Sequence, residues 1–280
     1  MANIPLKIVH QYLRHDKKFP HVWCAGCSNG IVLGAIIRAI ASMNLNQDEV
    51  VMVSGIGCSS RMPVYIDLNT LHTLHGRSIA FATGIKMHKP YMKVIVVTGD
   101  GDCTAIGGNH LIHAARRNID LSVILINNNI YGMTGGQCSP TTPHEAIATT
   151  APYGNIEPEF SICDLAMGAG ASFVARTTAF HVVEMQNYFQ AAMEHPGFSL
   201  IEVISACPVI YGRLNKKGGA PQMMKEFRDN SIPYTAVDKL PPEKVAGKII
   251  RGILRKEIKP EYCAAYADLV ARVADKGDEQ

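Results

Sequence analysis

The stretch KVIVVTGDGDCTAIGGNHLIHAARRNIDLSVILINNNIYG, residues 93–132, decides the fold. An apolar, β-branched run at 94–97 leads into Gly99, Asp100 and Gly101, and a second apolar run at 121–126 leads into the asparagines 127–129. The polar, helix-like segment between the runs makes the stretch a β-α-β unit with parallel strands. In an open parallel sheet, the carboxyl ends of both strands face the same crevice. The pattern therefore predicts that the GDG residues and the asparagines meet at one edge of a sheet.

Oxygen ligands and glycine-flanked backbone N–H groups share this predicted edge. Carboxylate and amide oxygens bind Mg²⁺, and free N–H groups at the start of a helix bind phosphate. A GDG tripeptide alone is more often a simple turn. GDG followed by NN one crossover later, however, resembles the signature of thiamine diphosphate enzymes. The resemblance implies that the side chains of Asp100 and Asn128 and the backbone carbonyl of Ile130 are ligands of Mg²⁺.

The composition is that of a globular protein without a nucleic-acid or membrane partner. The chain has 280 residues, of which 47% are hydrophobic and 18% are charged, so it can bury a full core. The formal net charge of +3 is not gathered into runs, which gives nucleic-acid binding no support. The longest apolar helix-like stretch, 31–43, is too short to span a bilayer and contains Arg38. The N-terminus lacks the basic-then-apolar order of a signal peptide, so we expect a cytoplasmic protein.

Strands and helices alternate as far as residue 210, which predicts an α/β fold with a doubly wound, mostly parallel sheet. Besides the central unit, strands are expected at 49–54, 173–176 and 200–205. Helices are expected at 31–43, 78–87, 162–170, 181–194, 242–255 and 261–276. We assign residues 1–212 to a cofactor-binding domain and residues 213–280 to a C-terminal extension that packs on a partner chain or on a second copy.

Four of the eight cysteines stand in distinctive surroundings. Cys24 and Cys27 form a CxxC motif, Cys58 lies in GIGCSS, and Cys207 lies in SACPVIYGR. Thiolates grouped at strand ends and glycine-rich turns bind Zn²⁺ or an iron–sulfur cluster. One pair with two remote single cysteines fits a cluster held by loops, although the spacing alone also leaves a zinc site or a redox dithiol open. Buried free thiols are expected for the other four, Cys103, Cys138, Cys163 and Cys263.

Seven motifs occur in order between residues 20 and 235: WCAGCSNG, GIGCSSR, LHTLHGR, TGDGD, INNNIYGMTGGQ, SPTTP and ACPVIYGR. Together they resemble the β subunit of the 2-oxoacid:ferredoxin oxidoreductases. The motifs TGGQ and SPTT are more similar to those of the 2-oxoglutarate branch than to those of the pyruvate branch. The resemblance implies one 4Fe–4S cluster held by Cys24, Cys27, Cys58 and Cys207, so residues 1–212 would hold the cluster as well as thiamine diphosphate and Mg²⁺.

The resemblance also implies which residues surround thiamine diphosphate. The segment 56–59 would lie at the cofactor, Gly101 and Asp102 would offer backbone N–H groups to the diphosphate, and 132–134 would close over it. The implied cofactor-binding residues are Ile56, Gly57, Cys58, Ser59, His75, Gly101, Asp102, Gly132, Met133 and Thr134. His75 and Arg61 are candidate catalytic residues, His75 at the aminopyrimidine or substrate and Arg61 at a substrate carboxylate. The alternatives are a structural, hydrogen-bonding role for His75 and, for Arg61, a surface arginine or one that tunes the cluster. Arg77 has the same ambiguity as Arg61.

The chain holds only the diphosphate half of a thiamine site, because the residues after 212 are too few for a second α/β domain. The resemblance implies an α subunit that supplies the pyrimidine domain and its glutamate, in an (αβ)2 assembly. It implies reversible, coenzyme A-dependent oxidative decarboxylation of 2-oxoglutarate to succinyl-CoA and CO2, with electrons passed to ferredoxin. The reverse direction fixes CO2, as in a reductive tricarboxylic acid cycle. The alternatives are the same chemistry on pyruvate, branched-chain or aryl 2-oxoacids, and a non-catalytic iron–sulfur or zinc subunit.

Overall fold

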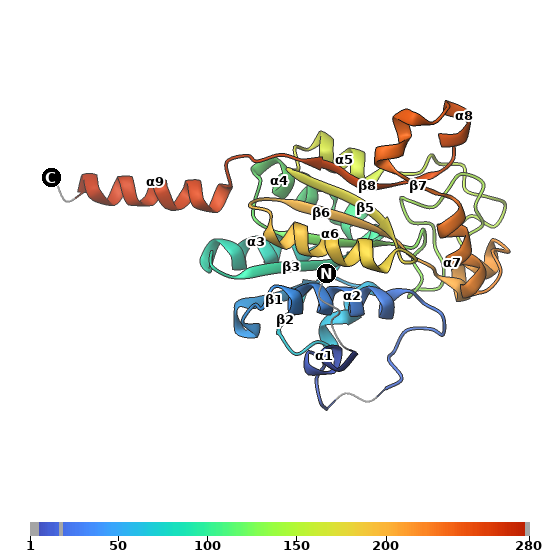
Figure 1. The fold of residues 1–280 in the computed structure, drawn as a ribbon, viewed down its shortest axis with the longest axis horizontal. Coiled ribbons are helices and arrows are strands. Elements are labelled where there is room, and N and C mark those ends of the chain that lie inside the picture. Colours follow the sequence, from blue (N-terminus) through green and yellow to red (C-terminus); the bar gives the residue numbers. More distant parts are fainter. Residues whose placement is uncertain (1–5, 17–18, 278–280) are drawn as a thin grey trace.

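The computed structural model describes residues 6–16 and 19–277. Its strands are β1 (Val50–Ser54), β2 (Asn69–His72), β3 (Lys93–Gly99), β4 (Ser122–Asn127), β5 (Phe173–Thr178), β6 (Ser199–Ile204), β7 (Ser231–Pro233) and β8 (Ile249–Lys256). They form one 8-stranded sheet in the order β2-β1-β3-β4-β6-β5-β8-β7 (Figure 1). All pairs from β2 to β5 in this order are parallel, and only β8 pairs antiparallel, with β5. The predicted α/β fold with a mostly parallel sheet is confirmed.

Helices cover both faces of the sheet. One face packs on α2 (Asn29–Ser42) and α6 (Val182–Glu194), and the other packs on α3 (Ser78–His88), α4 (Gly108–Arg117) and α5 (Ile162–Gly168). Successive side chains of each strand point to opposite faces of the pleated sheet. In β1, Val50 and Met52 pack in the core on the first face, and Val51 and Val53 pack in the core on the second. The central strands are therefore apolar on both sides and hold their carboxyl ends rigidly.

The β-α-β unit that the sequence predicts is present. After β3 the chain makes a short π-helix, Asp102–Ile106, then α4, and returns through β4, which pairs in parallel with β3. Asn118 ends α4 in a left-handed conformation with φ 53°, and its backbone N–H caps the helix, as asparagine does readily. The GDG residues and residues 127–129 therefore lie at the same edge of the sheet.

Two sequence-based expectations are wrong. The helix expected at 242–255 is replaced by a short α8, Pro242–Val245, and by β8. Gly247, with φ 71°, separates the two elements, and the β-branched residues that follow gain backbone partners along β5. No strand was expected between residues 54 and 93, but the edge strand β2 forms there.

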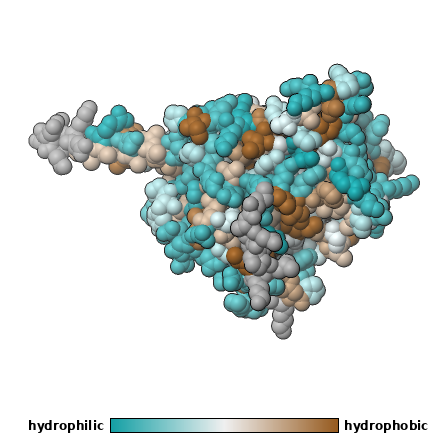
Figure 2. Space-filling view, in the orientation of Figure 1, coloured by the Kyte–Doolittle hydropathy of each residue, from teal (hydrophilic) through white to brown (hydrophobic). Residues whose placement is uncertain are grey.

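The residues after 212 contribute to the sheet and then leave it. They form α7 (Ala220–Asp229), β7, α8 and β8, and then α9 (Tyr262–Gly277), which extends away from the body of the molecule (Figure 1). Brown and pale-brown side chains lie along this projecting helix in Figure 2. Its exposed apolar side chains are Tyr262, Tyr266, Leu269, Val270 and Val273. Near the other end of the chain lies a short helix, α1 (Leu6–Gln11). Across the described residues, no helix combines the length and apolar character needed to cross a bilayer.

Candidate functional site

A cavity opens at the carboxyl ends of β1, β3 and β4. Every residue that the sequence predicts at the cofactor lines this cavity, and so do the three predicted Mg²⁺ ligands. The lining also contains Asn29 and Tyr131, to which the sequence assigned no role. Five segments that are distant in the sequence supply these residues: the start of α2 and the segments at the ends of β1, β2, β3 and β4.

Asp100 presents a carboxylate to this cavity from the start of the crossover. It is buried, with 4% of its surface exposed, and its Oδ2 accepts hydrogen bonds from Ser139 Oγ at 2.6 Å and Thr141 Oγ1 at 2.7 Å. Burial raises the pKa of Asp100, and the two hydroxyls oppose that shift. Neither hydroxyl contacts Oδ1. The two hydroxyls thus fix Asp100 through Oδ2.

The loop after β4 brings Asn128 and Ile130, the two other predicted Mg²⁺ ligands, to the same cavity. Asn127 Oδ1 accepts from Asn129 N at 3.1 Å and Asn128 Oδ1 accepts from Ile130 N at 3.2 Å, two successive turns closed by asparagine side chains. Asn129 has φ 62°, a conformation that asparagine tolerates well. These turns reverse the chain so that both Asn128 and Ile130 line the cavity.

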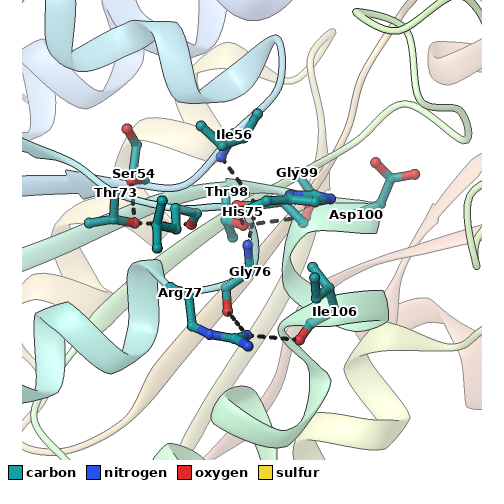
Figure 3. Close-up of polar contacts among 12 residues, drawn as sticks. Ser54, Ile56, Thr73, His75, Gly76, Arg77, Thr98, Gly99, Asp100 and Ile106 are labelled. Carbon is teal, nitrogen blue, oxygen red and sulfur yellow. Dashed lines mark hydrogen bonds and ion pairs between the residues drawn. The ribbon is translucent and has the colours of Figure 1, made fainter.

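Asp102 joins the loops that carry the other side of the cavity. Its Oδ1 accepts from Ile56 N at 3.2 Å, from Gly76 N at 2.7 Å and from His75 Nδ1 at 2.6 Å, and its Oδ2 accepts from Thr98 Oγ1 at 2.8 Å. Figure 3 shows the partners Ile56, His75, Gly76 and Thr98 close together, with the Asp100 carboxylate pointing away from them. The Asp102 side chain is therefore a structural acceptor that fixes the β1 and β2 loops and orients His75, leaving its backbone for a ligand.

Gly55, at the end of β1, makes room for that carboxylate. A Cβ at this position would overlap both oxygens of Asp102. We expect Gly55→Ala to lower the free energy of unfolding by about 1–3 kcal/mol, because the buried Asp102 must shift and lose hydrogen bonds. Thermal unfolding of the complex checks this. Gly84→Ala is the matched control, since a Cβ there meets no atom within 4 Å, and its Tm should not fall; equal Tm values for the two variants would contradict the prediction.

The four distinctive cysteines gather beside the cavity. Burial raises the pKa of Cys58 to about 12, with further contributions from the nearby Cys27, Cys207 and Cys24 thiols. A Cβ on Gly132, which lines the cavity, would lie 3.6 Å from Cys207 Sγ and 3.7 Å from Cys58 Sγ. The Trp23 indole donates to the carbonyl of Cys58 at 2.6 Å and so ties the CxxC loop to the Cys58 loop. Glycine at 132 leaves open space between two of the sulfurs and the cavity.

All eight cysteines are free thiols. Among the described residues, no group of three or more His, Cys, Asp or Glu side chains is arranged to hold a single metal ion. Four thiolates around a cubane bind four separate irons, so their sulfurs lie farther apart than the ligands of one zinc ion. Four free thiols that are not arranged around a single metal ion are therefore compatible with a loop-held cluster of four irons.

Two buried polar atoms at the cavity have no hydrogen-bond partner among residues 6–16 and 19–277. They are Asn29 Oδ1 and Ser59 Oγ, both on residues that line the cavity. The other end of the Asn29 amide donates to Cys27 Sγ at 3.3 Å, so this side chain links the cavity to the thiol group. Buried polar atoms are normally satisfied, and unsatisfied ones at a cavity indicate a ligand. The donor set and these orphan atoms fit thiamine diphosphate, Mg²⁺ and an adjacent cluster.

The two predicted arginines lie outside the cavity. Arg61 is exposed, three residues after Cys58, and its charge acts on the Cys58 thiol. Arg77 contacts the carbonyls of Gly76 and Ile106 through Nη1 at 3.5 Å and 3.4 Å. The structure therefore gives neither residue a direct contact with the cavity, and a carboxylate-binding role for Arg61 stays a prediction.

The sequence-based analysis assigned no role to Ser139 and Thr141, although both stand in SPTTP, a motif that it quoted. In the sequence alone, hydroxyl side chains in a loop do not indicate a role at a binding site. Only the fold shows that this loop returns over Asp100.

Comparisons with known proteins agree with this site. Residues 50–203 match the family described as thiamine pyrophosphate enzyme, C-terminal TPP binding domain. The 2-oxoglutarate synthase subunit KorB of Methanothermobacter marburgensis is 49% identical, over 96% of this chain and 94% of its own length. The subunit of the same name from Methanocaldococcus jannaschii is 48% identical over 94% of this chain and 97% of its own length.

A solved structure extends the match to three dimensions. The 2-oxoglutarate:ferredoxin oxidoreductase from Magnetococcus marinus, with 2-oxoglutarate, coenzyme A and succinyl-CoA bound, aligns with a TM-score of 0.84 and 33% identity. The alignment covers 98% of this chain and 92% of that one. The motifs, the site and these relatives agree: the chain belongs to the KorB family, the β subunits of the thiamine diphosphate-dependent 2-oxoglutarate:ferredoxin oxidoreductases.

Proposed function

We propose that this chain, together with an α subunit, catalyses the coenzyme A-dependent oxidative decarboxylation of 2-oxoglutarate to succinyl-CoA and CO2, with ferredoxin as electron acceptor. Thiamine diphosphate and Mg²⁺ would bind in the cavity and one 4Fe–4S cluster on the four thiols. The observation that carries the proposal is that Cys58, one of the four thiols, lines the cavity, and that the cavity residue Gly132 lies against the sulfurs of Cys58 and Cys207. An electron donor in the cavity and an acceptor on the thiols would thus be neighbours.

The residues divide into three sets. Asp100, Asn128 and the carbonyl of Ile130 would hold Mg²⁺, and the backbone N–H groups of Gly101 and Asp102 would bind the diphosphate. The segments 56–59 and 132–134 would enclose the cofactor from opposite sides. When bound, thiamine diphosphate supplies the carbanion chemistry of decarboxylation, and the cluster carries single electrons.

His75 has a defined proton arrangement. The ionised Asp102 carboxylate only accepts hydrogen bonds, so Nδ1 of His75 carries the proton at the 2.6 Å contact. In the neutral ring Nε2 is then an acceptor, and His75 lines the cavity. We propose that this nitrogen accepts a proton from the cofactor or from the substrate during turnover.

A second chain would complete the site. The cavity is built from the diphosphate-binding half alone, and the α subunit would supply the pyrimidine-binding half and its glutamate, in an (αβ)2 assembly. The exposed apolar side chains of α9 need a cover, because a single projecting helix of this length is marginal in water. We propose that residues 213–280 contribute to this contact with the α subunit or with a second β chain.

We also propose that the protein is cytoplasmic, a location that fits the labile cluster.

Turnover of the purified complex with a viologen acceptor tests the proposal. With coenzyme A present, 2-oxoglutarate should be preferred over pyruvate by at least about tenfold in kcat/KM. Faster turnover of pyruvate, or of a branched-chain or aryl 2-oxoacid, would assign the chain to another branch of the same chemistry. A complex that retains no thiamine would instead point to the non-catalytic iron–sulfur or zinc subunit.

A further inference from the structure

Glu202 on β6 is a buried carboxylate that does not line the cofactor cavity. It has a full set of donors within the chain. Oε2 accepts from Arg176 Nε at 2.7 Å and from Cys163 Sγ at 3.2 Å, and Oε1 accepts from Asn127 Nδ2 at 2.8 Å. Burial of an ionised carboxylate is costly even when it is paired. Nothing in the chemistry of the cofactor cavity uses this group directly, so its presence needs another reason.

Hydrogen bonds connect Glu202 to Asp100 through two intervening side chains. Asn127 donates to Glu202, and its Oδ1 lies 2.9 Å from Thr141 Oγ1. The same Thr141 hydroxyl lies 2.7 Å from Asp100 Oδ2. Asn127, Thr141 and Asp100 are all buried, so water does not replace these contacts.

The charge on Glu202 fixes the direction of this path. An ionised carboxylate only accepts hydrogen bonds, so the NH2 group of Asn127 must face Glu202 and the amide oxygen must face Thr141. The Thr141 hydroxyl has one proton and two acceptors within reach, so it donates either to Asp100 Oδ2 or to Asn127 Oδ1. Both contacts hold the Thr141 hydroxyl beside the Asp100 carboxylate.

We propose that Glu202 is a positioning residue for the divalent cation of the cofactor cavity. Through Asn127 and Thr141 it sets the orientation of Asp100, and through Asn127 alone it anchors the end of β4 from which Asn128 projects. The inference rests on the proposed function, in which Asp100 and Asn128 are the cation's ligands. Glu202 and Arg176 line a second cavity, of about 630 Å³, whose lining also includes Asn127, Asn128 and Thr141. Glu202 itself does not line the cofactor cavity, so we assign its effect on the cation to the contacts through Asn127 and Thr141.

Glu202→Gln tests the inference in the complete complex, freed of cation and cofactor. The amide offers one acceptor oxygen where the carboxylate has two, so it cannot accept from both Arg176 and Asn127. Titration with Mn²⁺ in the presence of thiamine diphosphate, followed by electron paramagnetic resonance, measures the Kd directly. We expect the Kd to rise by about tenfold, the lower end of the effect of losing an outer partner of a metal ligand. Thr141→Val, which breaks the same path without touching the Arg176–Glu202 pair, should weaken Mn²⁺ binding similarly.

Two further variants separate the possible outcomes. Cys163→Ala removes a different donor from Glu202 and should leave the Kd for Mn²⁺ unchanged, which controls for packing around the carboxylate. Asp100→Asn should abolish Mn²⁺ binding. If it does, but Glu202→Gln and Thr141→Val both bind Mn²⁺ like the unaltered complex, the positioning role is wrong and the cation site stands. If Asp100→Asn also binds Mn²⁺ normally, the cation site itself is wrong.

Discussion

Replacement of Asp100 by alanine should remove Mg²⁺ and thiamine diphosphate from the purified complex while the iron content stays unchanged. Asp100 is the one carboxylate among the predicted cation ligands, and its Oδ1 is not engaged by Ser139 or Thr141. Loss of a direct ligand should cost more than the roughly 10–100-fold in affinity that loss of an outer partner costs. Thiamine released from the denatured complex and iron per β chain, both measured by chemical assay, check the prediction.

The same substitution should not unfold the protein. Burial raises the pKa of Asp100, which means that the folded chain without a cation disfavours its ionised form. Removal of the side chain relieves that cost, although it leaves Ser139 and Thr141 without an acceptor. Asp48→Ala, at an exposed aspartate, serves as the control and should retain the full complement of both cofactors. Normal thiamine content in Asp100→Ala would show that the diphosphate is held elsewhere.

The central β-α-β unit could be predicted from the sequence because its information is local. Apolar β-branched runs, glycines and asparagines follow each other in the order that a parallel crossover needs, and the resulting fold brings Asp100 and Asn128 to one cavity. The residues implied by the family resemblance likewise converge there. These motifs place backbone or short side chains directly at the cavity, so their residue types are restricted.

The partners of these residues could not be predicted, because they are close only in three dimensions. Ser139 and Thr141 meet Asp100, and Glu202 meets Asn127, across long separations in the chain. The pattern around 242–255 was misleading for a related reason. Its residues suit a helix or an edge strand, and pairing with β5, which the sequence does not display, decides for β8.

Replacement of Cys207 by alanine should remove or degrade the visible absorption of the complex. Burial raises the pKa values of Cys27, Cys58 and Cys207, and neighbouring thiols of the group raise them further. Raised pKa values favour the protonated thiols in the absence of metal, and positively charged iron must displace these protons. One missing ligand leaves a corner of the cluster open to solvent and oxygen. We therefore expect the iron content to fall under anaerobic purification, with greater loss in air.

Cys138→Ala is the matched control for this substitution. Cys138 packs in the same apolar cluster near Cys207, so its removal makes a comparable change in packing without removing a predicted ligand. Its spectrum should match that of the unaltered complex. An unchanged spectrum in Cys207→Ala together with a bleached one in Cys138→Ala would move the fourth ligand to Cys138. Because Cys58 and Cys207 both flank Gly132, that outcome would also weaken the argument that the cluster adjoins the cofactor cavity.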